Sequence, residues 1–364
     1  MKKVEEILEQ LVSFDTVDDK ENERIINWIS DFCLKAGFET KKIRNKKDNK
    51  VGLVVHGGNS KKNGLIFMGH TDTVPAGDGW KTNPFDLTQK NNDFFGLGSS
   101  DMKGGIAAML SSISEIDLKK LNKGLELIFT YDEEKYFGGI KSIVGKHKIS
   151  ADCIVVGEPT SLEPVVATKG MLVFKINFIG KEAHGSNPEI GINAIEMASI
   201  FIIEFKKYFR KIEKESSCLF GSPTATSNIS IISGGNAVNR VPAACSLEFE
   251  TRIIDNKQKE KINDIIKEII KKNKFKAQSE ITFSSSVTKC QNKEFVSIIE
   301  KITKKKAVGV NYTAENSFLP NSNCSIILGP GTIKCAHMPN EKVSKNSLYS
   351  AVKIYKELIN KFCV

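Results

Sequence analysis

The feature that most constrains this 364-residue chain is the stretch GHTDTVP, residues 69–75, and the apolar run just before it. Residues 65–68 are short and wholly apolar, so they predict a buried strand. His70 and Asp72 follow the end of that strand. In an open α/β sheet, groups that bind ligands collect outside the carboxyl ends of the strands. A histidine and a carboxylate two residues apart therefore form a candidate metal site.

Further ionisable residues lie in loops beside other predicted core elements. They are Asp101 before a helix, Glu133 and Glu134 after the strand 125–130, Glu158 after the strand 153–156, and His337 beyond the strand 324–328. We expect these loops to share one edge of the sheet, where converging carboxylates and imidazoles would repel or lack partners without cations. The pattern predicts a two-metal site with the nitrogen and oxygen donors of catalytic zinc. Its ligands would be His70, Asp101, Glu134, Glu158 and His337.

Two acidic positions allow roles other than metal binding. Glu133 and Glu134 are adjacent, so a turn must orient them, because in a straight strand they would point to opposite faces. If one of them binds metal, the other can stand beside the reacting water as general base. Asp72 would accept the free ring N–H of His70 and so fix its tautomer.

The order of predicted elements indicates an α/β fold with two domains. Residues 1–168 and 288–364 predict a catalytic domain with a central, mostly parallel sheet flanked by helices, in which strands 51–56 and 65–68 are neighbours. Residues 169–287 follow the order strand, helix, strand, strand, helix, strand. This is the split βαβ pattern of ferredoxin-like folds, so we expect a compact inserted α+β domain, which could close as a lid around a hinge near Lys169 and Val287.

Composition argues against several classes of protein. The net charge of +10 comes from 53 Lys and Arg against 43 Asp and Glu, and many lysines alternate with acids at helical intervals, as in residues 257–276. This spacing indicates solvated helix faces, so we expect no nucleic-acid partner. Acidic residues interrupt the N-terminal apolar positions, which predicts neither a signal peptide nor a membrane partner. We therefore expect a cytoplasmic protein, and eight scattered cysteines without a CxxC pair indicate reduced thiols.

Seven motifs, in order, carry a resemblance to a known family. They are GHTDTVPAGDGW, GLGSSDMKGG, YDEE, GEPTS, GKEAHGSNPEIGINAIE, GGNAVNRVP and LGPGTIKCAHMPNE. Nearly end to end, the chain resembles the dinuclear zinc deacylases and exopeptidases that include acetylornithine deacetylase, succinyl-diaminopimelate desuccinylase, carboxypeptidase G and aminoacylase. The phrases GEPTSLEPVVATKG, VNYTAENSF and ILGPGTIKCAHMPNE are similar to the acetylornithine-deacetylating branch in particular.

The resemblance implies a role for each candidate residue. His70 and Glu158 would bind one Zn²⁺, Glu134 and His337 would bind the other, and Asp101 would bridge the two, with Co²⁺ as a possible substitute. Glu133 would be the general base and Asp72 the orienting acid. The inserted domain would form a homodimer, in which His184 reaches the neighbouring subunit's site and stabilises the oxyanion. Asn239 and Arg252 would bind the carboxylate of a small-molecule substrate.

The reaction implied is metal-dependent hydrolysis of the N-acyl amide of an N-acyl amino acid. The substrate expected is N2-acetylornithine, split to ornithine and acetate as in arginine biosynthesis. A succinyl-diaminopimelate desuccinylase and a broad-range metallo-dipeptidase or aminoacylase stay open as alternatives. Thr168 and Gly185 depart from the usual residues of the branch and leave room for a shifted preference. A succinyl group would add a carboxylate that needs its own cationic partner.

Overall fold

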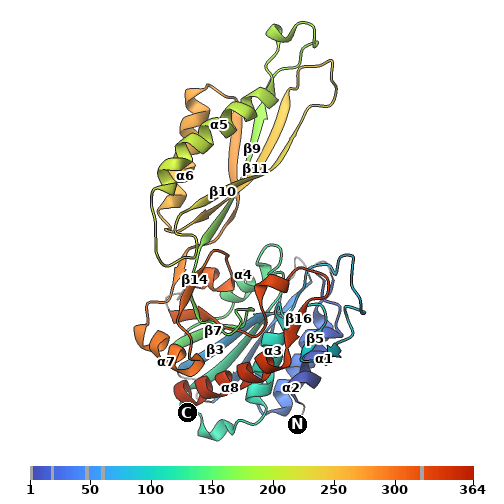
Figure 1. The fold of residues 1–364 in the computed structure, drawn as a ribbon, viewed down its shortest axis with the longest axis vertical. Coiled ribbons are helices and arrows are strands. Elements are labelled where there is room, and N and C mark those ends of the chain that lie inside the picture. Colours follow the sequence, from blue (N-terminus) through green and yellow to red (C-terminus); the bar gives the residue numbers. More distant parts are fainter. Residues whose placement is uncertain (1–2, 18–19, 46–48, 59–61, 320–323) are drawn as a thin grey trace. The chain divides into compact units, whose positions relative to one another are not determined.

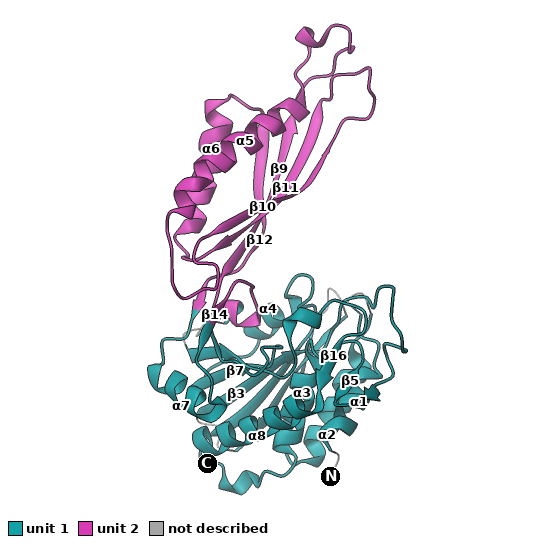
Figure 2. Ribbon diagram, in the orientation of Figure 1, with its two compact units in different colours: residues 1–166, 289–308, 318–364 teal, residues 167–288, 309–317 magenta. Residues whose placement is uncertain are grey.

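The computed structural model describes residues 3–17, 20–45, 49–58, 62–319 and 324–364. Its contacts divide the chain into two compact units, coloured separately in Figure 2. The first unit comprises Met1–Val166, Lys289–Val308 and Phe318–Val364, and the second comprises Ala167–Thr288 and Gly309–Ser317. Each unit has its own hydrophobic core.

The second unit contains a segment that the sequence had assigned to the first. Residues 309–317 were expected in the catalytic domain, but their contacts group them with the second unit. The Thr313 hydroxyl donates to the backbone oxygen of Lys169 at 2.8 Å and lies 3.3 Å from the Ser285 hydroxyl. Gly309 also forms a β-bridge with Phe220. These tertiary contacts decide the grouping, and the local sequence pattern does not encode them.

A mixed sheet with a parallel centre organises the first unit. The central strands are β6 (Gly124–Thr130), β3 (Asn63–His70), β7 (Cys153–Val156) and β15 (Ser325–Ile327), paired in parallel in that order. The flanking strands are β1 (Glu39–Arg44), β2 (Val51–Gly57), β8 (Val165–Thr168), β13 (Thr288–Lys289) and β14 (Val308–Val310). The full order is β1-β2-β6-β3-β7-β15-β8-β13, with β14 beside β8. This confirms the expected α/β class with a central, mostly parallel sheet.

The prediction that strands 51–56 and 65–68 are neighbours is wrong, because β6 lies between them. Leu53 of β2 pairs with Phe129 of β6 in antiparallel register, and Phe67 of β3 pairs with Leu127 of β6 in parallel register. Every residue of β6 is buried, which suits a strand flanked on both edges. The two strands are close along the chain, which suggested that they pair with each other. Instead, each of them pairs with β6.

Helices cover both faces of this sheet, as Figure 1 shows. Strand side chains on one face share a core with α1 (Val4–Val12), α2 (Glu23–Lys35), α3 (Lys103–Ile113), α7 (Lys293–Thr303) and α8 (Lys345–Phe362). The helix α4 (Gly138–Val144) packs on the other face, where Ile143 lies against Gly52. The buried positions of α1 recur at three- and four-residue spacing, as its sequence predicts. The helices thereby leave the carboxyl ends of the central strands to the loops.

A small antiparallel sheet lies beside the loops at these ends. It consists of β4 (Thr88–Lys90), β5 (Asp93–Phe95) and β16 (Lys342–Ser344), in the order β16-β5-β4. The sheet joins segments about 250 residues apart, since Lys342 pairs with Phe95. It brings the chain just before α8 next to the loop that leads into α3.

The second unit has the predicted split βαβ topology. Its elements are β9 (Gly170–Ile179), α5 (Ala194–Glu213), β10 (Thr226–Gly234), β11 (Ala244–Ile253), α6 (Gln258–Lys272) and β12 (Ala277–Ser284). The strand order is β10-β11-β9-β12, and every neighbouring pair is antiparallel. Stacked rings of Phe174 and Phe249 join the sheet to Phe205 of α5. Burial of each phenylalanine stabilises the folded unit by roughly 1.5–3 kcal/mol relative to an exposed side chain.

The helices of the described residues include no segment that is both long and apolar enough to cross a lipid bilayer. All eight cysteines lie among the described residues, and none of them forms a disulfide bond.

Candidate metal centre

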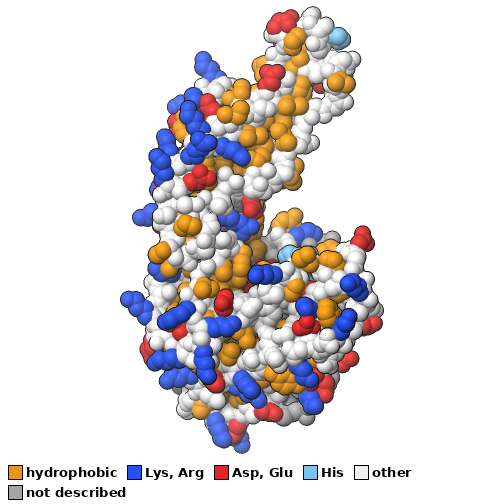
Figure 3. Space-filling model, viewed as in Figure 1, with side chains coloured by type: hydrophobic (Ala, Val, Ile, Leu, Met, Phe, Trp, Pro, Cys, Tyr) orange, Lys and Arg blue, Asp and Glu red, His pale blue; other side chains and the backbone are white. Residues whose placement is uncertain are grey.

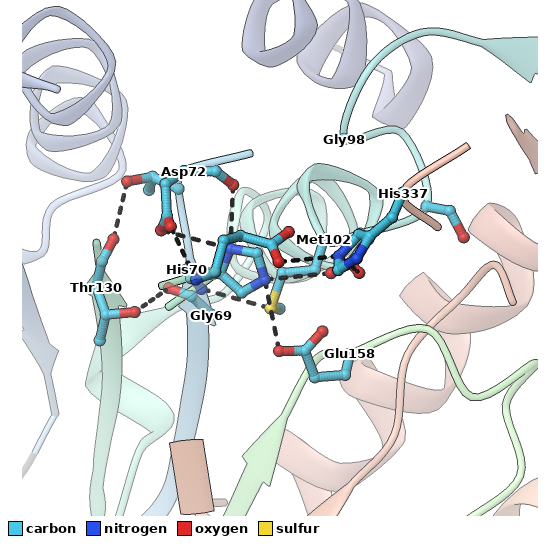
Figure 4. A network of polar contacts seen from close by, with 12 residues as sticks. Gly69, His70, Asp72, Gly98, Met102, Thr130, Glu158 and His337 are labelled. Atoms are coloured by element: carbon cyan, nitrogen blue, oxygen red, sulfur yellow. Dashed lines mark hydrogen bonds and ion pairs between the residues drawn. The ribbon is translucent and has the colours of Figure 1, made fainter. Parts of the chain in front are cut away.

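The candidate site forms where the central parallel strands of the first unit end. His70 is the last residue of β3 and is fully buried. Glu134 lies in the loop after β6, and Glu158 lies two residues after the end of β7. Because these strands are parallel, their carboxyl ends meet at one edge of the sheet. Figure 4 shows the resulting network, with Asp72 on one side of the His70 ring and Glu158 and His337 on the other.

Asp101 lies between two pairs of ligand-type side chains. Its Oδ1 lies 3.2 Å from His70 Nε2, and its Oδ2 lies 3.4 Å from His337 Nε2. His70 Nε2 is also 3.5 Å from Glu158 Oε1. His337 Nε2 is 2.9 Å from Glu134 Oε2. The structure therefore brings together the five residues that the sequence proposed as ligands, with the two oxygens of Asp101 facing different histidines.

The spacing of these atoms fits divalent metal ions. Tetrahedral zinc with bonds of about 2.0–2.1 Å places its donor atoms about 3.3 Å apart, and the distances above run from 2.9 to 3.5 Å. His70, Asp101 and Glu134 each offer one ligand atom within 4.8 Å of the others. Glu134 Oε1 is buried and has no hydrogen-bond partner in the described part of the chain. A buried carboxylate oxygen without a partner costs free energy, and a bound cation would remove that cost. The residues present therefore fit a metal centre.

The pKa values at this centre reflect an excess of negative charge. Hydrogen bonds to Asp101 and Glu134 raise the pKa of His337 to about 10. Burial opposes the charged form of His70, yet the charge of Glu158 and the bond to Asp101 hold the pKa of His70 well above its ordinary value. Burial likewise opposes ionisation of Asp101, but His337 and His70 lower its pKa. An anionic pocket of this kind attracts cations.

Asp72 contacts both the histidine and the neighbouring loop. His70 Nδ1 lies 3.1 Å from the backbone oxygen of Asp72 and 3.5 Å from its carboxylate Oδ1. Asp72 Oδ2 accepts a hydrogen bond from the backbone N–H of Glu134 at 3.2 Å. The backbone carbonyl is thus the nearer acceptor for the ring N–H. The Asp72 carboxylate also joins the loop after β3 to the loop after β6 through its bond to Glu134.

Glu133 lies in the same acidic environment as the ligand-type residues. Burial raises the pKa of Glu133 well above its ordinary value, and the charges of Glu158, Glu134 and Asp101 add to this shift while His70 opposes it. Glu134, and not Glu133, joins His70 and Asp101 in the group of close ligand atoms. The adjacent glutamates therefore occupy different positions at the site.

Sequence reasoning missed two buried charged residues beside the centre. The Glu341 carboxylate accepts hydrogen bonds from backbone N–H groups in the loop that carries Asp101. Lys103 is fully buried, donates from Nζ to the backbone oxygen of Phe14 at 2.8 Å, and has its pKa lowered to about 8 by burial. Both residues fall inside motifs of the family resemblance, but a lone Glu after a turn and a Lys at a helix start give no local signal of burial.

The other three candidate residues belong to the second unit. His184 and Asn239 lie in adjacent loops, since His184 forms a β-bridge with Arg240 and the Gly185 N–H donates to Asn239 O at 2.8 Å. Both side chains are exposed. Arg252 lies near the opposite end of β11, about 26 Å along the strand from Ala244 at the usual rise per residue. The unit brings His184 and Asn239 together, but not Arg252.

Arg252 already has an acidic partner on its own strand. Its Nε and Nη2 donate to the two carboxylate oxygens of Glu250 at 3.3 and 3.2 Å. Both side chains are about one-quarter exposed. Any carboxylate that Arg252 binds must therefore compete with Glu250.

Comparison with known proteins places this architecture in a family. A profile of the peptidase family M20/M25/M40 matches residues 66–361. An acetylornithine deacetylase of Buchnera aphidicola subsp. Acyrthosiphon pisum (strain Tuc7) is 35% identical over 374 aligned positions, covering 98% of this chain and 97% of that protein. A second acetylornithine deacetylase, from Pasteurella multocida (strain Pm70), is 32% identical and covers 96% and 94% of the two chains.

Solved structures show the same fold at lower sequence identity. The M20 family metallo-carboxypeptidase Sso-CP2 from Sulfolobus solfataricus has a TM-score of 0.78, with 18% identity and coverage of 100% of this chain and 99% of that chain. The Bacillus subtilis YXEP protein, a dinuclear metal-binding peptidase of the M20 family, has a TM-score of 0.71 at 12% identity, covering 98% and 96%. The protein belongs to the peptidase family M20/M25/M40. It is a metal-dependent amidohydrolase of that family.

Proposed function

We propose that this protein hydrolyses N2-acetylornithine to ornithine and acetate, a reaction of arginine biosynthesis. The observation that carries the proposal is the position of Asp101, whose two oxygens face His70 at 3.2 Å and His337 at 3.4 Å. Relatives at 32–35% identity, aligned over nearly the whole chain, are named acetylornithine deacetylase. They favour the acetyl substrate over the succinyl and dipeptide alternatives.

Two divalent cations would complete the site. His70 and Glu158 would hold one of them, Glu134 and His337 the other, and Asp101 would bridge the pair. Zn²⁺ suits this set of nitrogen and oxygen donors, and Co²⁺ would substitute for it. When bound, such ions polarise the acyl carbonyl and make water more acidic.

The residues of the chain supply the proton transfers. Glu133 would accept a proton from a water molecule as the water oxygen attacks the acyl carbon. It would then deliver that proton to the amine as the C–N bond breaks. Asp72 would hold Glu134 and the His70 ring in place through the contacts described above. The OH of the water thus ends on the acetyl carbon and its other hydrogen on the amine nitrogen, which yields acetate and ornithine.

His184 would donate a hydrogen bond to the oxyanion of the tetrahedral intermediate. Its Nδ1 accepts from the backbone N–H of Ser186 at 3.2 Å, so in the neutral ring the proton resides on Nε2. Nε2–H is then a donor at the exposed end of the ring, which is the group that oxyanion stabilisation needs. Asn239, in the loop beside it, and Arg252, near the far end of β11, would bind the substrate carboxylate from different copies of the chain.

A homodimer would form through the second unit. The strand β10 is at the edge of its sheet and exposes Ile231 and Ile232, each more than half exposed. On α5, Ile200 and Ile203 are exposed one helical turn apart. Figure 3 shows hydrophobic side chains gathered over the strands of this unit. An exposed edge strand with apolar side chains suits pairing with a second copy of the chain. That pairing would bring His184 to the partner's site. The dimer would act in the cytoplasm.

Acetate release from N2-acetylornithine tests the proposal, with the protein loaded with zinc or cobalt. A parallel panel should contain N-succinyl-diaminopimelate, N-acetylmethionine and an unblocked dipeptide. We expect N2-acetylornithine to have the highest kcat/KM, and elemental analysis to find two metal ions per chain. Faster hydrolysis of the succinyl compound would identify a desuccinylase, and no hydrolysis of any member would contradict the enzyme assignment.

A further inference from the structure

Glu341 is a buried carboxylate that receives three backbone hydrogen bonds. Its Oε2 accepts from the N–H of Gly98 at 2.8 Å, and its Oε1 accepts from the N–H groups of Ser100 and Asp101, also at 2.8 Å. The residue is 2% exposed. A buried backbone N–H that loses its acceptor is costly, so these three bonds resist displacement of the carboxylate. Glu341 therefore holds the loop that carries Asp101.

The fold places Glu341 beside this loop through the small antiparallel sheet. Glu341 directly precedes β16, which pairs with β5, and its backbone oxygen accepts the Gly96 N–H at 3.1 Å. The loop that follows β5 must then run past the Glu341 side chain. Gly98 has φ +74, and a Cβ at this position would press on Thr73 and Lys103. The glycine thus lets the loop fold tightly around the carboxylate.

Glu341 also lies four residues after His337 on the same segment. That segment thus contributes a ligand-type side chain and the acceptor that holds the Asp101 loop. Asp101 in turn places one oxygen 3.4 Å from His337 and the other 3.2 Å from His70. A displacement of the Glu341 carboxylate would move Asp101 relative to both histidines.

We propose that Glu341 is a positioning residue, which holds Asp101 where its two oxygens can bind both metal ions. This inference rests on the proposed metal centre but not on the identity of the substrate. Groups that orient metal ligands typically change metal affinity 10- to 100-fold when they are replaced. In Glu341→Gln, an amide NH₂ would replace one acceptor oxygen and face a backbone N–H, so the loop must shift.

The test measures zinc binding by the full-length protein in competition with a chromophoric chelator. The melting temperature of the metal-free protein is measured alongside. We expect Glu341→Gln to weaken both zinc equivalents 10- to 100-fold, beyond any effect that its lower stability explains. Glu126→Gln is the matched control, because Glu126 is equally buried on β6 but interacts with His147 at 3.1 Å. The control should lower the melting temperature and leave zinc affinity unchanged.

A lower melting temperature with zinc affinity within threefold of wild type would overturn the proposal, since it would show a structural role alone. Wild-type protein that binds fewer than two zinc ions would also overturn it. If Glu341→Gln does not fold, Glu341→Asp supplies the same measurements with a charged but shorter side chain, and unchanged affinity there is contrary to the proposal. Tight, Glu341-dependent binding of two zinc ions without hydrolysis of N2-acetylornithine would contradict the proposed function and leave this inference standing.

Discussion

The carboxylate of Asp72 accepts a hydrogen bond from the backbone N–H of Glu134, with 3.2 Å between Oδ2 and N. This contact joins the loop after β3 to the loop after β6. Asp132, just before the two glutamates, has φ +59, which turns the chain at that point. The turn and the hydrogen bond let Glu134 reach His337 at 2.9 Å while Glu133 takes a different position. Adjacent carboxylates can thereby serve separate roles.

Glu133→Gln should abolish turnover while both metal ions stay bound. General-base catalysis contributes about 10²- to 10⁴-fold to rates, so we expect kcat to fall by at least 10²-fold. Steady-state kinetics and elemental analysis on the same preparation check this. Glu134→Gln is the contrasting variant, because it should lose metal as well as activity. Loss of metal from the Glu133 variant instead would reverse the two roles.

Asp72→Asn should weaken metal binding about 10-fold or more without unfolding the protein. An amide NH₂ would face the Glu134 N–H or the ring of His70, so one of the two contacts must break. Zinc titration against a chelator measures the change. Asp86→Asn, in an exposed loop, is the control and should titrate like wild type. Equal zinc affinity in both variants would mean that the backbone oxygen of Asp72 orients His70 unaided.

Glu250→Gln should lower the KM for N2-acetylornithine by up to about fivefold at constant kcat. A partly exposed ion pair is worth about 1 kcal/mol or less, and its loss would remove an internal competitor for the Arg252 guanidinium. Glu248→Gln is the control, since Glu248 lies on β11 as Glu250 does but pairs with Lys175 of β9, at 3.0 Å. Initial-rate measurements over a range of substrate concentrations decide the matter. A raised KM would show that Glu250 supports substrate binding and does not compete with it.

Ile203→Glu together with Ile231→Lys should convert the protein to a monomer. Charges at these exposed positions would disfavour pairing through α5 and β10. Because His184 would act on the partner's site, we expect kcat to fall about 10²- to 10³-fold with the metal content unchanged. Light scattering after gel filtration reports the oligomeric state. Leu34→Glu, on the exposed side of α2, is the control, and a fully active monomer would refute the shared-site arrangement.

Cys218 should be the first thiol that iodoacetamide modifies in the native protein at pH 7.5. It is exposed, whereas burial raises the pKa of the Cys290 thiol to about 11 and that of Cys363 to about 12. High pKa values leave little reactive thiolate, and burial blocks the reagent. Mass spectrometry of labelled peptides checks the order of reaction, with urea-unfolded protein as the fully reactive control. Early labelling of Cys363 would mean that the C-terminal part of α8 unfolds readily.

Residues that interact with near neighbours in the chain could be predicted from the sequence. The burial of α1 and the alternation in β9 and β11 follow from spacing alone, because each helix or strand presents a fixed periodicity to its core. His70 and Glu158 could be proposed as members of one site because parallel strands bring their carboxyl ends to one edge. In the structure His70 Nε2 lies 3.5 Å from Glu158 Oε1.

Long-range contacts settled what the sequence left open. The insertion of β6 between β2 and β3 depends on which apolar edges pair, and a strand's own residues do not specify its neighbour. Residues 309–317 group with the second unit through the contacts of Thr313 and Gly309. The pairing of Arg252 with Glu250 depends on the conformations of the two side chains. The first two depend on the folding of distant segments, whose outcome local patterns do not contain, whereas Glu250 and Arg252 lie two residues apart on β11.

The sequence by itself determined the kinds of side chain at the strand ends and, with them, the chemistry of the candidate centre. Tertiary structure alone decided how those side chains are held. Glu341 shows the difference, since its carboxylate lies 2.8 Å from the backbone N–H of Asp101, a residue 240 positions earlier in the chain. Backbone N–H groups are present in nearly every residue, so no sequence pattern identifies which of them a buried carboxylate will bind.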